Sequence, residues 1–208
     1  MKIAQNKISS LNLYVNKALR DIRNGIVHSQ GSADKQHGKA GEIAVARFFD
    51  FRGENGNLFD QNGHSCDIPK YVAERSNLPK EFHHDIEIKF YEKTRKTFLM
   101  GDAVKKIKKI KSGLVLIIVS YDKEPCNVCD LQIIKIEPCR RSKSDFEHME
   151  ETVAFVKDKS NPIKGYEGTR EKVKKENKKL TSNRFYLNDN SNSRNNARQV
   201  QLCYKLNS

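Results

Sequence analysis

Three residues in the middle of the chain, Asp67, Glu87 and Lys89, have the types and spacing that metal-dependent phosphodiester hydrolysis requires. A divalent cation at a scissile phosphate needs two or more hard oxygen ligands, and the attacking water must be oriented or deprotonated. We expect the carboxylates of Asp67 and Glu87, with the main-chain carbonyl of Ile88, to bind such a cation. Lys89 would then help to form the nucleophile and stabilise the charge of the transition state.

Residues 85–91 carry two of these groups and form the clearest strand pattern in the sequence. Charged residues at positions 85, 87 and 89 alternate with apolar residues at 86, 88 and 90. Because successive side chains of a strand point to opposite faces, Glu87 and Lys89 must share a face with Asp85. Asp85 is therefore a rival to Asp67 as the first metal ligand. A solvent-exposed strand with an incidental ion pair is the alternative interpretation.

The segments around this strand have alternating helical and extended patterns. Apolar residues at three- and four-residue spacing predict two helices, over residues 39–51 and 103–110. Further strands are predicted over residues 65–72, 114–121 and 131–136. Glu42 lies in the first turn of the first of these helices, and Pro69 confines its strand to a sheet edge or ends it early. The order helix, strand, strand, helix, strand, strand predicts an α/β core.

Asp67, a spacer of 19 residues and the run Glu87-Ile88-Lys89 together resemble the PD-(D/E)XK motif of restriction endonucleases and related nucleases. Cys66 takes the place of the motif's proline. The segment GKAGEIAVARFF resembles the first core helix of that superfamily, in which a residue equivalent to Glu42 often faces the metal site. The resemblance covers residues 38–137 and implies a restriction-endonuclease-like αβββαβ core, in which helices flank a central mixed sheet.

The same resemblance implies an activity and a domain organisation. The expected protein is a type II restriction endonuclease that cuts double-stranded DNA as a homodimer with Mg2+, for which Mn2+ substitutes, and without an organic cofactor. A Holliday junction resolvase or repair nuclease, or a non-catalytic DNA-binding protein, is the alternative. We expect one nuclease domain over residues 1–208, made of a helical extension (1–37), the catalytic core (38–137) and an extension for DNA reading or dimerisation (138–208).

Patterns in the two extensions are also interpretable. Apolar spacing predicts a helix over residues 8–23. In the charge-dense segment that follows the core we expect a helix over residues 145–157, a lysine-rich helix over 170–180 and a hairpin over 183–206. The formal net charge of +13 indicates a polyanionic partner, for which nucleic acid is the first candidate. Residues of types that contact phosphates and base edges are candidates for DNA binding: Lys105, Lys106, Lys108, Lys109, Arg184, Arg194, Arg198, Gln199 and Gln201. Solvated lysines and a polar loop are the alternative interpretation.

The remaining features concern compartment and zinc. The sequence has neither an apolar run long enough to span a bilayer nor a secretory signal pattern, which favours a cytoplasmic protein without a membrane partner. Its five cysteines are an odd, irregularly spaced set, as expected of reduced thiols. Cys126, Cys129 and Cys139, with His148, offer a structural zinc site as a lesser alternative.

Overall fold

The computed structural model describes residues 1, 5–27, 33–59, 67–122, 126–136, 140–163, 165–181, 184–189 and 199–206. The chain divides into two compact units. The first unit comprises Met1–Arg95 and Gly113–Ile136, and the second comprises Lys96–Ser112 and Glu137–Ser208. The predicted core over residues 38–137 therefore falls across both units. Within the described ranges, every helix is too short or too polar to cross a membrane.

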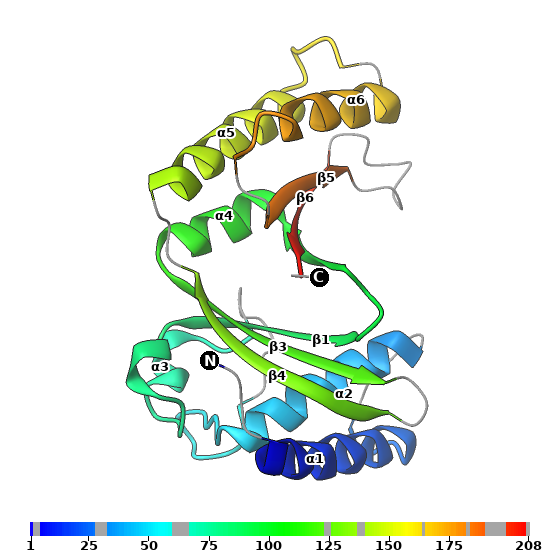
Figure 1. The fold of residues 1–208 in the computed structure, drawn as a ribbon, viewed down its shortest axis with the longest axis vertical. Helices are drawn as coiled ribbons and strands as arrows, with labels where there is room; N and C mark the ends of the chain where they lie inside the picture. The colour runs from blue at the N-terminus through cyan, green and yellow to red at the C-terminus, as the bar shows by residue number, and fades with distance from the viewer. Residues whose placement is uncertain are drawn as a thin grey trace. The chain divides into compact units, whose positions relative to one another are not determined.

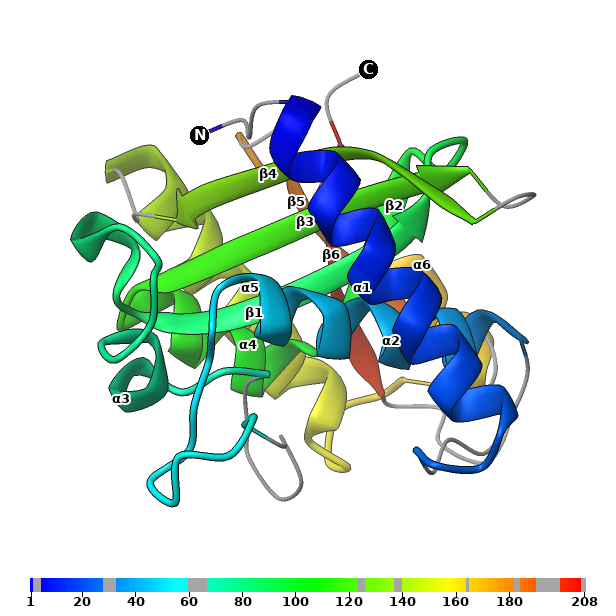
Figure 2. The ribbon, with the colours of Figure 1, turned by 90° about the horizontal axis from the view of Figure 1, so that it is seen from below.

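A mixed three-stranded sheet with helices packed on it forms the first unit, so the predicted α/β class is confirmed at this level. The strand order is β1 (Asp85–Glu92), β3 (Leu114–Asp122), β4 (Asn127–Ile136), with β3 parallel to β1 and antiparallel to β4. Helices α1 (Gln5–Arg23) and α2 (Ala33–Phe48) lie side by side along the sheet (Figures 1 and 2).

Apolar patterning accounts for these elements. The run predicted as a buried strand becomes β3, in which every residue from Leu114 to Tyr121 is buried. Helix α1 buries one stripe at three- and four-residue spacing: Ile8, Leu11, Val15, Ala18, Leu19 and Ile22. The predicted helix over residues 39–51 is α2, although it begins six residues earlier and ends three residues earlier. The strand predicted from residue 131 is β4, which begins four residues earlier.

The strand predicted over residues 65–72 ends early, at Pro69, which was one of the two outcomes expected from the sequence; residues 65 and 66 lie outside the described residues. Of the described residues in that range, Ile68 alone forms a bridge, with Ile86 of β1, and Lys70–Ala73 form the short helix α3. Pro69 is the cause, because its φ of −67° and ψ of 152° place it at the N-cap of α3. Proline is well tolerated at a helix start, where its missing N–H costs no hydrogen bond.

The described residues of the second unit form an antiparallel sheet and three helices. Its strand order is β2 (Thr97–Asp102), β6 (Val200–Lys205), β5 (Phe185–Asp189), which confirms the predicted hairpin and adds β2, a strand that was not predicted. Helix α4 (Ala103–Lys111) matches its prediction. Helices α5 (Arg140–Lys157) and α6 (Gly165–Asn177) begin five residues before their predicted starts, and α6 also ends three residues early.

Candidate active site

A main-chain bridge places Asp67 beside the strand that carries Glu87 and Lys89. Ile68 and Ile86 exchange two hydrogen bonds, of 3.1 and 2.8 Å, and Asp67 Oδ2 accepts a third from Ile88 N at 2.6 Å. The Asp67 side chain thereby continues the ladder along the edge of β1 that faces away from β3. The N–H and C=O of one strand residue point to the same side, so the Ile88 carbonyl lies at this same edge.

Glu87 and Lys89 form an ion pair on one face of β1, as the alternation predicted. Lys89 Nζ lies 2.7 Å from Glu87 Oε1, and the side chains are 21% and 4% exposed. Burial acts to lower the pKa of Lys89, but the carboxylates of Glu87 and Asp67 outweigh burial and raise this pKa above its usual value. The lysine is therefore held as a cation. The low exposure of Glu87 argues against an incidental surface pair.

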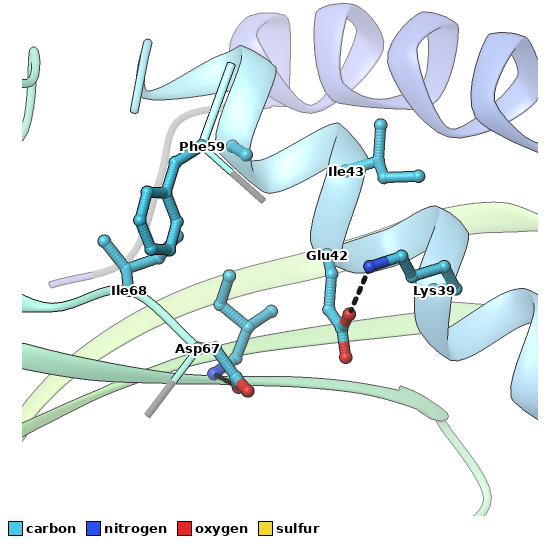
Figure 3. A pocket seen from close by; sticks show the side chains of 8 residues that line it. Lys39, Glu42, Ile43, Phe59, Asp67 and Ile68 are labelled. Atoms are coloured by element: carbon cyan, nitrogen blue, oxygen red, sulfur yellow. Dashed lines mark hydrogen bonds and ion pairs between the residues drawn. The ribbon is translucent and has the colours of Figure 1, made fainter. Parts of the chain in front are cut away.

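Glu42 joins this group from α2. Figure 3 shows Glu42 reaching from the helix toward Asp67 and the Lys39 amino group beside Glu42, with Glu42 Oε2 and Lys39 Nζ 3.9 Å apart. Burial and the nearby charge of Asp67 raise the pKa of Glu42 to about 7, although Lys39 and Lys89 act to lower it. Four of the predicted residues, Asp67, Glu87, Lys89 and Glu42, are thus coupled electrostatically within the first unit.

A small pocket lies between α2 and the edge of β1. Its lining residues are Lys39, Glu42, Ile43, Ala46, Phe59, Asp67, Ile68 and Ile88. Phe59 and Ile68 provide an apolar wall beside the polar groups (Figure 3). The sequence interpretation did not include Lys39 or Phe59 in the site. The three-residue spacing of Lys39 and Glu42 was a usable signal for the former, because residues three apart share one face of a helix.

Asp85, the rival to Asp67, has a different role in the structure. Its Oδ1 accepts a hydrogen bond of 3.0 Å from the main-chain N–H of Lys70, the first residue of α3. The carboxylate therefore satisfies one of the unpaired amides at the helix start. Asp67, by contrast, contributes to the raised pKa of both Glu42 and Lys89. These contacts favour Asp67 as the site carboxylate.

The donor set suits a hard divalent cation in its chemistry. Asp67, Glu87 and Glu42 are carboxylates, and the repulsion that raises the pKa of Glu42 is of a kind that a bound cation relieves. As the side chains stand, no three His, Cys, Asp or Glu residues of the described ranges converge as a ligand group. Asp67 is bonded to Ile88 N and Glu87 to Lys89, so binding a cation requires these side chains to exchange partners.

The predicted DNA-binding residues belong to the second unit. Lys105, Lys106, Lys108 and Lys109 lie on α4, where Lys105 and Lys108 are exposed. Arg184 precedes β5 and is exposed, and Gln201 is half-buried on β6, next to the exposed Gln199. Arg194 and Arg198 lie outside the described residues.

The candidate zinc ligands are divided between the units. Cys126 and Cys129 lie at the start of β4 in the first unit, His148 lies on α5 in the second, and Cys139 is outside the described residues. Burial raises the pKa of Cys126 to about 11, and Cys129 Sγ donates a hydrogen bond to Asp122 Oδ2 at 3.1 Å. Both thiols are thus held in the protonated form, and a metal would have to displace their protons in order to bind.

Comparison of the chain with protein-family models, with curated proteins and with solved structures gave no match. Function is therefore inferred from the geometry of the first unit and from the charge of the second.

Replacing Glu42 by glutamine is expected to stabilise the protein above neutral pH. Because the folded-state pKa of Glu42 is raised from 4.5 to about 7, the folded state binds more protons than the unfolded state between these values. Stability is lost as the pH rises through this window, by up to about 3 kcal/mol, and the glutamine variant avoids that loss. Urea unfolding at about pH 5 and about pH 8, in EDTA, measures the difference.

Glu74→Gln is the matched control for this prediction. Glu74 is 49% exposed and pairs with Lys70 at 3.7 Å on the surface of α3 and its C-cap. Its replacement should change stability by less than about 0.5 kcal/mol at either pH. If the stability of the Glu42→Gln variant and of the unaltered protein changed equally with pH, Glu42 would not be the carboxylate whose raised pKa lowers stability.

Proposed function

We propose that this protein is a Mg2+-dependent endodeoxyribonuclease of the PD-(D/E)XK type, acting on double-stranded DNA. The observation that carries the proposal is the group at the edge of β1. There Asp67 is hydrogen-bonded to Ile88 N, and the buried Glu87 is paired with Lys89 on the same strand. The proposed finer fold is the restriction-endonuclease-like core, of which the mixed sheet of β1, β3 and β4 is the part supported here.

In this proposal Asp67, Glu87 and the Ile88 carbonyl would hold the cation. When bound, Mg2+ would supply charge neutralisation at the scissile phosphate and a coordinated water of lowered pKa. Mn2+, also a hard cation that oxygen ligands suit, is expected to substitute.

The protein's own groups act around that position. Lys89, held as a cation by its carboxylate neighbours, orients the attacking water and stabilises the negative charge that develops on the phosphate. Glu42, which lines the same pocket as Asp67, is a carboxylate suited to accept a proton from the water. Lys39, which lines the same pocket, offers a second cation for a phosphate oxygen.

Among nucleases of this type we favour a type II restriction endonuclease acting as a homodimer on a short palindrome. The second unit supports this choice, because it supplies a sheet and three helices beyond the site and includes the hairpin with Gln199 and Gln201. A structure-selective resolvase or repair nuclease needs little beyond a minimal core. Digestion of plasmid DNA with Mg2+ should yield discrete fragments. Cleavage confined to branched DNA would instead identify a resolvase, and binding without cleavage a non-catalytic protein.

Replacing Asp67 by asparagine is expected to lower the cleavage rate by about 100-fold or more, because a metal ligand worth several kcal/mol of transition-state stabilisation is lost. The fold should survive, since the amide oxygen of asparagine still accepts the hydrogen bond from Ile88 N. Plasmid nicking rates at saturating Mg2+ provide the measurement. Asp85→Asn is the isosteric control on β1, and it should cut at nearly the normal rate. The reverse ranking of these two variants would assign the metal to Asp85.

A further inference from the structure

The two units differ greatly in net charge. The second unit contains 22 Lys and Arg against 11 Asp and Glu, a net charge of +11, whereas the first contains 17 against 15. Nearly all of the chain's charge of +13 therefore belongs to the unit that lacks the candidate active site. Such an excess attracts a polyanion through counterion release, so the second unit is where a DNA-binding surface is to be sought.

Strand alternation divides the sheet of the second unit into two faces. One face is apolar and packs on the helices: Phe185 and Tyr204 form an edge-to-face pair, and Phe146 of α5 packs against Phe185. Leu187 and Leu202 continue this buried face. The opposite face, which we call the Tyr186 face, comprises Thr97, Leu99, Tyr186, Asn188, Gln201, Cys203 and Lys205.

Tyr186 lies in the middle of this face. It is paired in register with Cys203 of β6, and its hydroxyl is hydrogen-bonded to the side chains of Thr97 on β2 and of Cys203. These two partners hold the ring across β6 and above Cys203, which is 1% exposed. Lys205 Nζ lies 5.4 Å from the centre of the ring. The centre of the face is therefore a fixed aromatic surface with a cation beside it.

Different polar groups lie at the two ends of the Tyr186 face. Lys205 and Arg184, joined by a main-chain hydrogen bond of 2.7 Å, are both exposed at one end. Arg184 lies at the edge of the face, where its Nη1 donates a hydrogen bond of 3.3 Å to the hydroxyl of Tyr204 on the buried side. Asn188 and Gln201 lie directly opposite each other in the register at the other end, and both are half-buried. Asp102, the β2 neighbour of Gln201, directs its carboxylate to Lys105 N of α4 and to Lys157 of α5. Its charge is therefore already paired with cationic and N–H groups of the helices.

We infer that the Tyr186 face binds the DNA duplex, with Lys205 and, at the edge of the face, Arg184 on phosphates and the Asn188–Gln201 pair on base edges. Basic side chains fix the position of a protein on the backbone, and amide side chains pair with adenine in the major groove, which a β-ribbon or sheet can enter. Tyr186 and Leu99, which is 48% exposed, supply apolar area for deoxyribose and the thymine methyl group. The inference rests on the proposed function for its substrate.

The test measures equilibrium binding of the full chain to a fluorescein-labelled duplex in EDTA, where cleavage is suppressed, over a series of salt concentrations. The double variant Arg184→Ala/Lys205→Ala should bind about tenfold or more weakly, and the slope of log K against log salt should fall in magnitude by about 2. The matched control is Lys174→Ala/Lys175→Ala, which removes the same charge from exposed positions on α6. This control variant should lose less DNA affinity than Arg184→Ala/Lys205→Ala, and its slope of log K against log salt should fall less.

Asn188→Ala/Gln201→Ala tests the other end of the face. It should leave the salt slope unchanged and blur or abolish the fragment pattern of plasmid digestion, because the lost contacts are to bases and carry no charge. Equal losses of DNA affinity in Arg184→Ala/Lys205→Ala and in Lys174→Ala/Lys175→Ala would show that net charge alone attracts DNA, and would overturn the inference. So would unaltered binding by Arg184→Ala/Lys205→Ala in a protein that cuts DNA. If the unaltered chain neither binds nor cuts DNA, it is the proposed function that fails.

Discussion

Replacing Lys89 by alanine is expected to lower the rate of DNA cleavage by about 100- to 1,000-fold, the usual cost of removing one preorganised group that stabilises transition-state charge. The same change should destabilise the fold by about 3 kcal/mol, because Glu87 would remain buried without the cation that now lies 2.7 Å from it. Single-turnover cleavage and urea unfolding measure the two effects separately. DNA affinity in EDTA should fall much less than the rate.

Lys93→Ala is the control for this prediction. Lys93 is the first residue after β1 and also forms an ion pair, with Asp122 at 2.6 Å. In this pair both side chains are exposed, Lys93 at 54% and Asp122 at 42%. Pairs of this kind contribute little to stability, so the variant should unfold and cut like the unaltered protein. If Lys89→Ala cuts at the normal rate, the assignment of the active site is wrong. If both variants lose activity alike, the loss reflects general charge and not the position of Lys89.

Replacing Gly41 by alanine is expected to have the largest effect among changes outside the charged group. Helix α2 meets β1 at this residue, where an added Cβ would lie 2.5 Å from Cβ and Cδ2 of Phe90 and would also overlap Cγ. The Phe90 ring cannot easily move, because it is stacked on Tyr121 at 4.4 Å and Tyr121 is 5% exposed. Overpacking of this kind should destabilise the protein by about 2–3 kcal/mol.

The effect of Gly41→Ala should extend to the active site. Glu42 is the next residue of α2, so a helix displaced from β1 carries its carboxylate away from Asp67. The pKa of Glu42 should then fall toward its usual value, because both burial and the repulsion from Asp67 decrease. A change in the pH dependence of stability, measured by urea unfolding across the same pH range as for Glu42→Gln, reports this displacement.

Gly38→Ala provides the control within the same helix. An added Cβ at Gly38 meets nothing within 4 Å, so alanine should stabilise α2 by up to about 1 kcal/mol through its better helix propensity. In the double variant Gly41→Ala/Phe90→Leu, the smaller side chain should leave room for the added methyl group and make the two losses less than additive. Strict additivity of these losses would rule out the Gly41–Phe90 contact as the cause.

Several features of this protein were determined by local sequence. The alternation over residues 85–91 is enough to place Glu87 and Lys89 on one face of a strand, and the 2.7 Å ion pair confirms it. The apolar run of residues 114–121 specifies a strand buried on both faces, and the spacing in α1 specifies its buried stripe. These predictions succeed because the period of side-chain directions is a property of the backbone itself.

Other features were decided by contacts between segments distant in the sequence. Asp67 reaches the site because its neighbour Ile68 pairs with Ile86 just before Pro69 ends the extended segment. Residues 97–102 become β2 by pairing with β6, about a hundred positions later in the sequence. The electrostatics of the site also depend on contacts between distant segments. Only the packing of α2 on β1 through Gly41 brings Glu42 close enough to Asp67 to raise its pKa to about 7, since burial and Coulomb repulsion depend on distance in space and not on order along the chain.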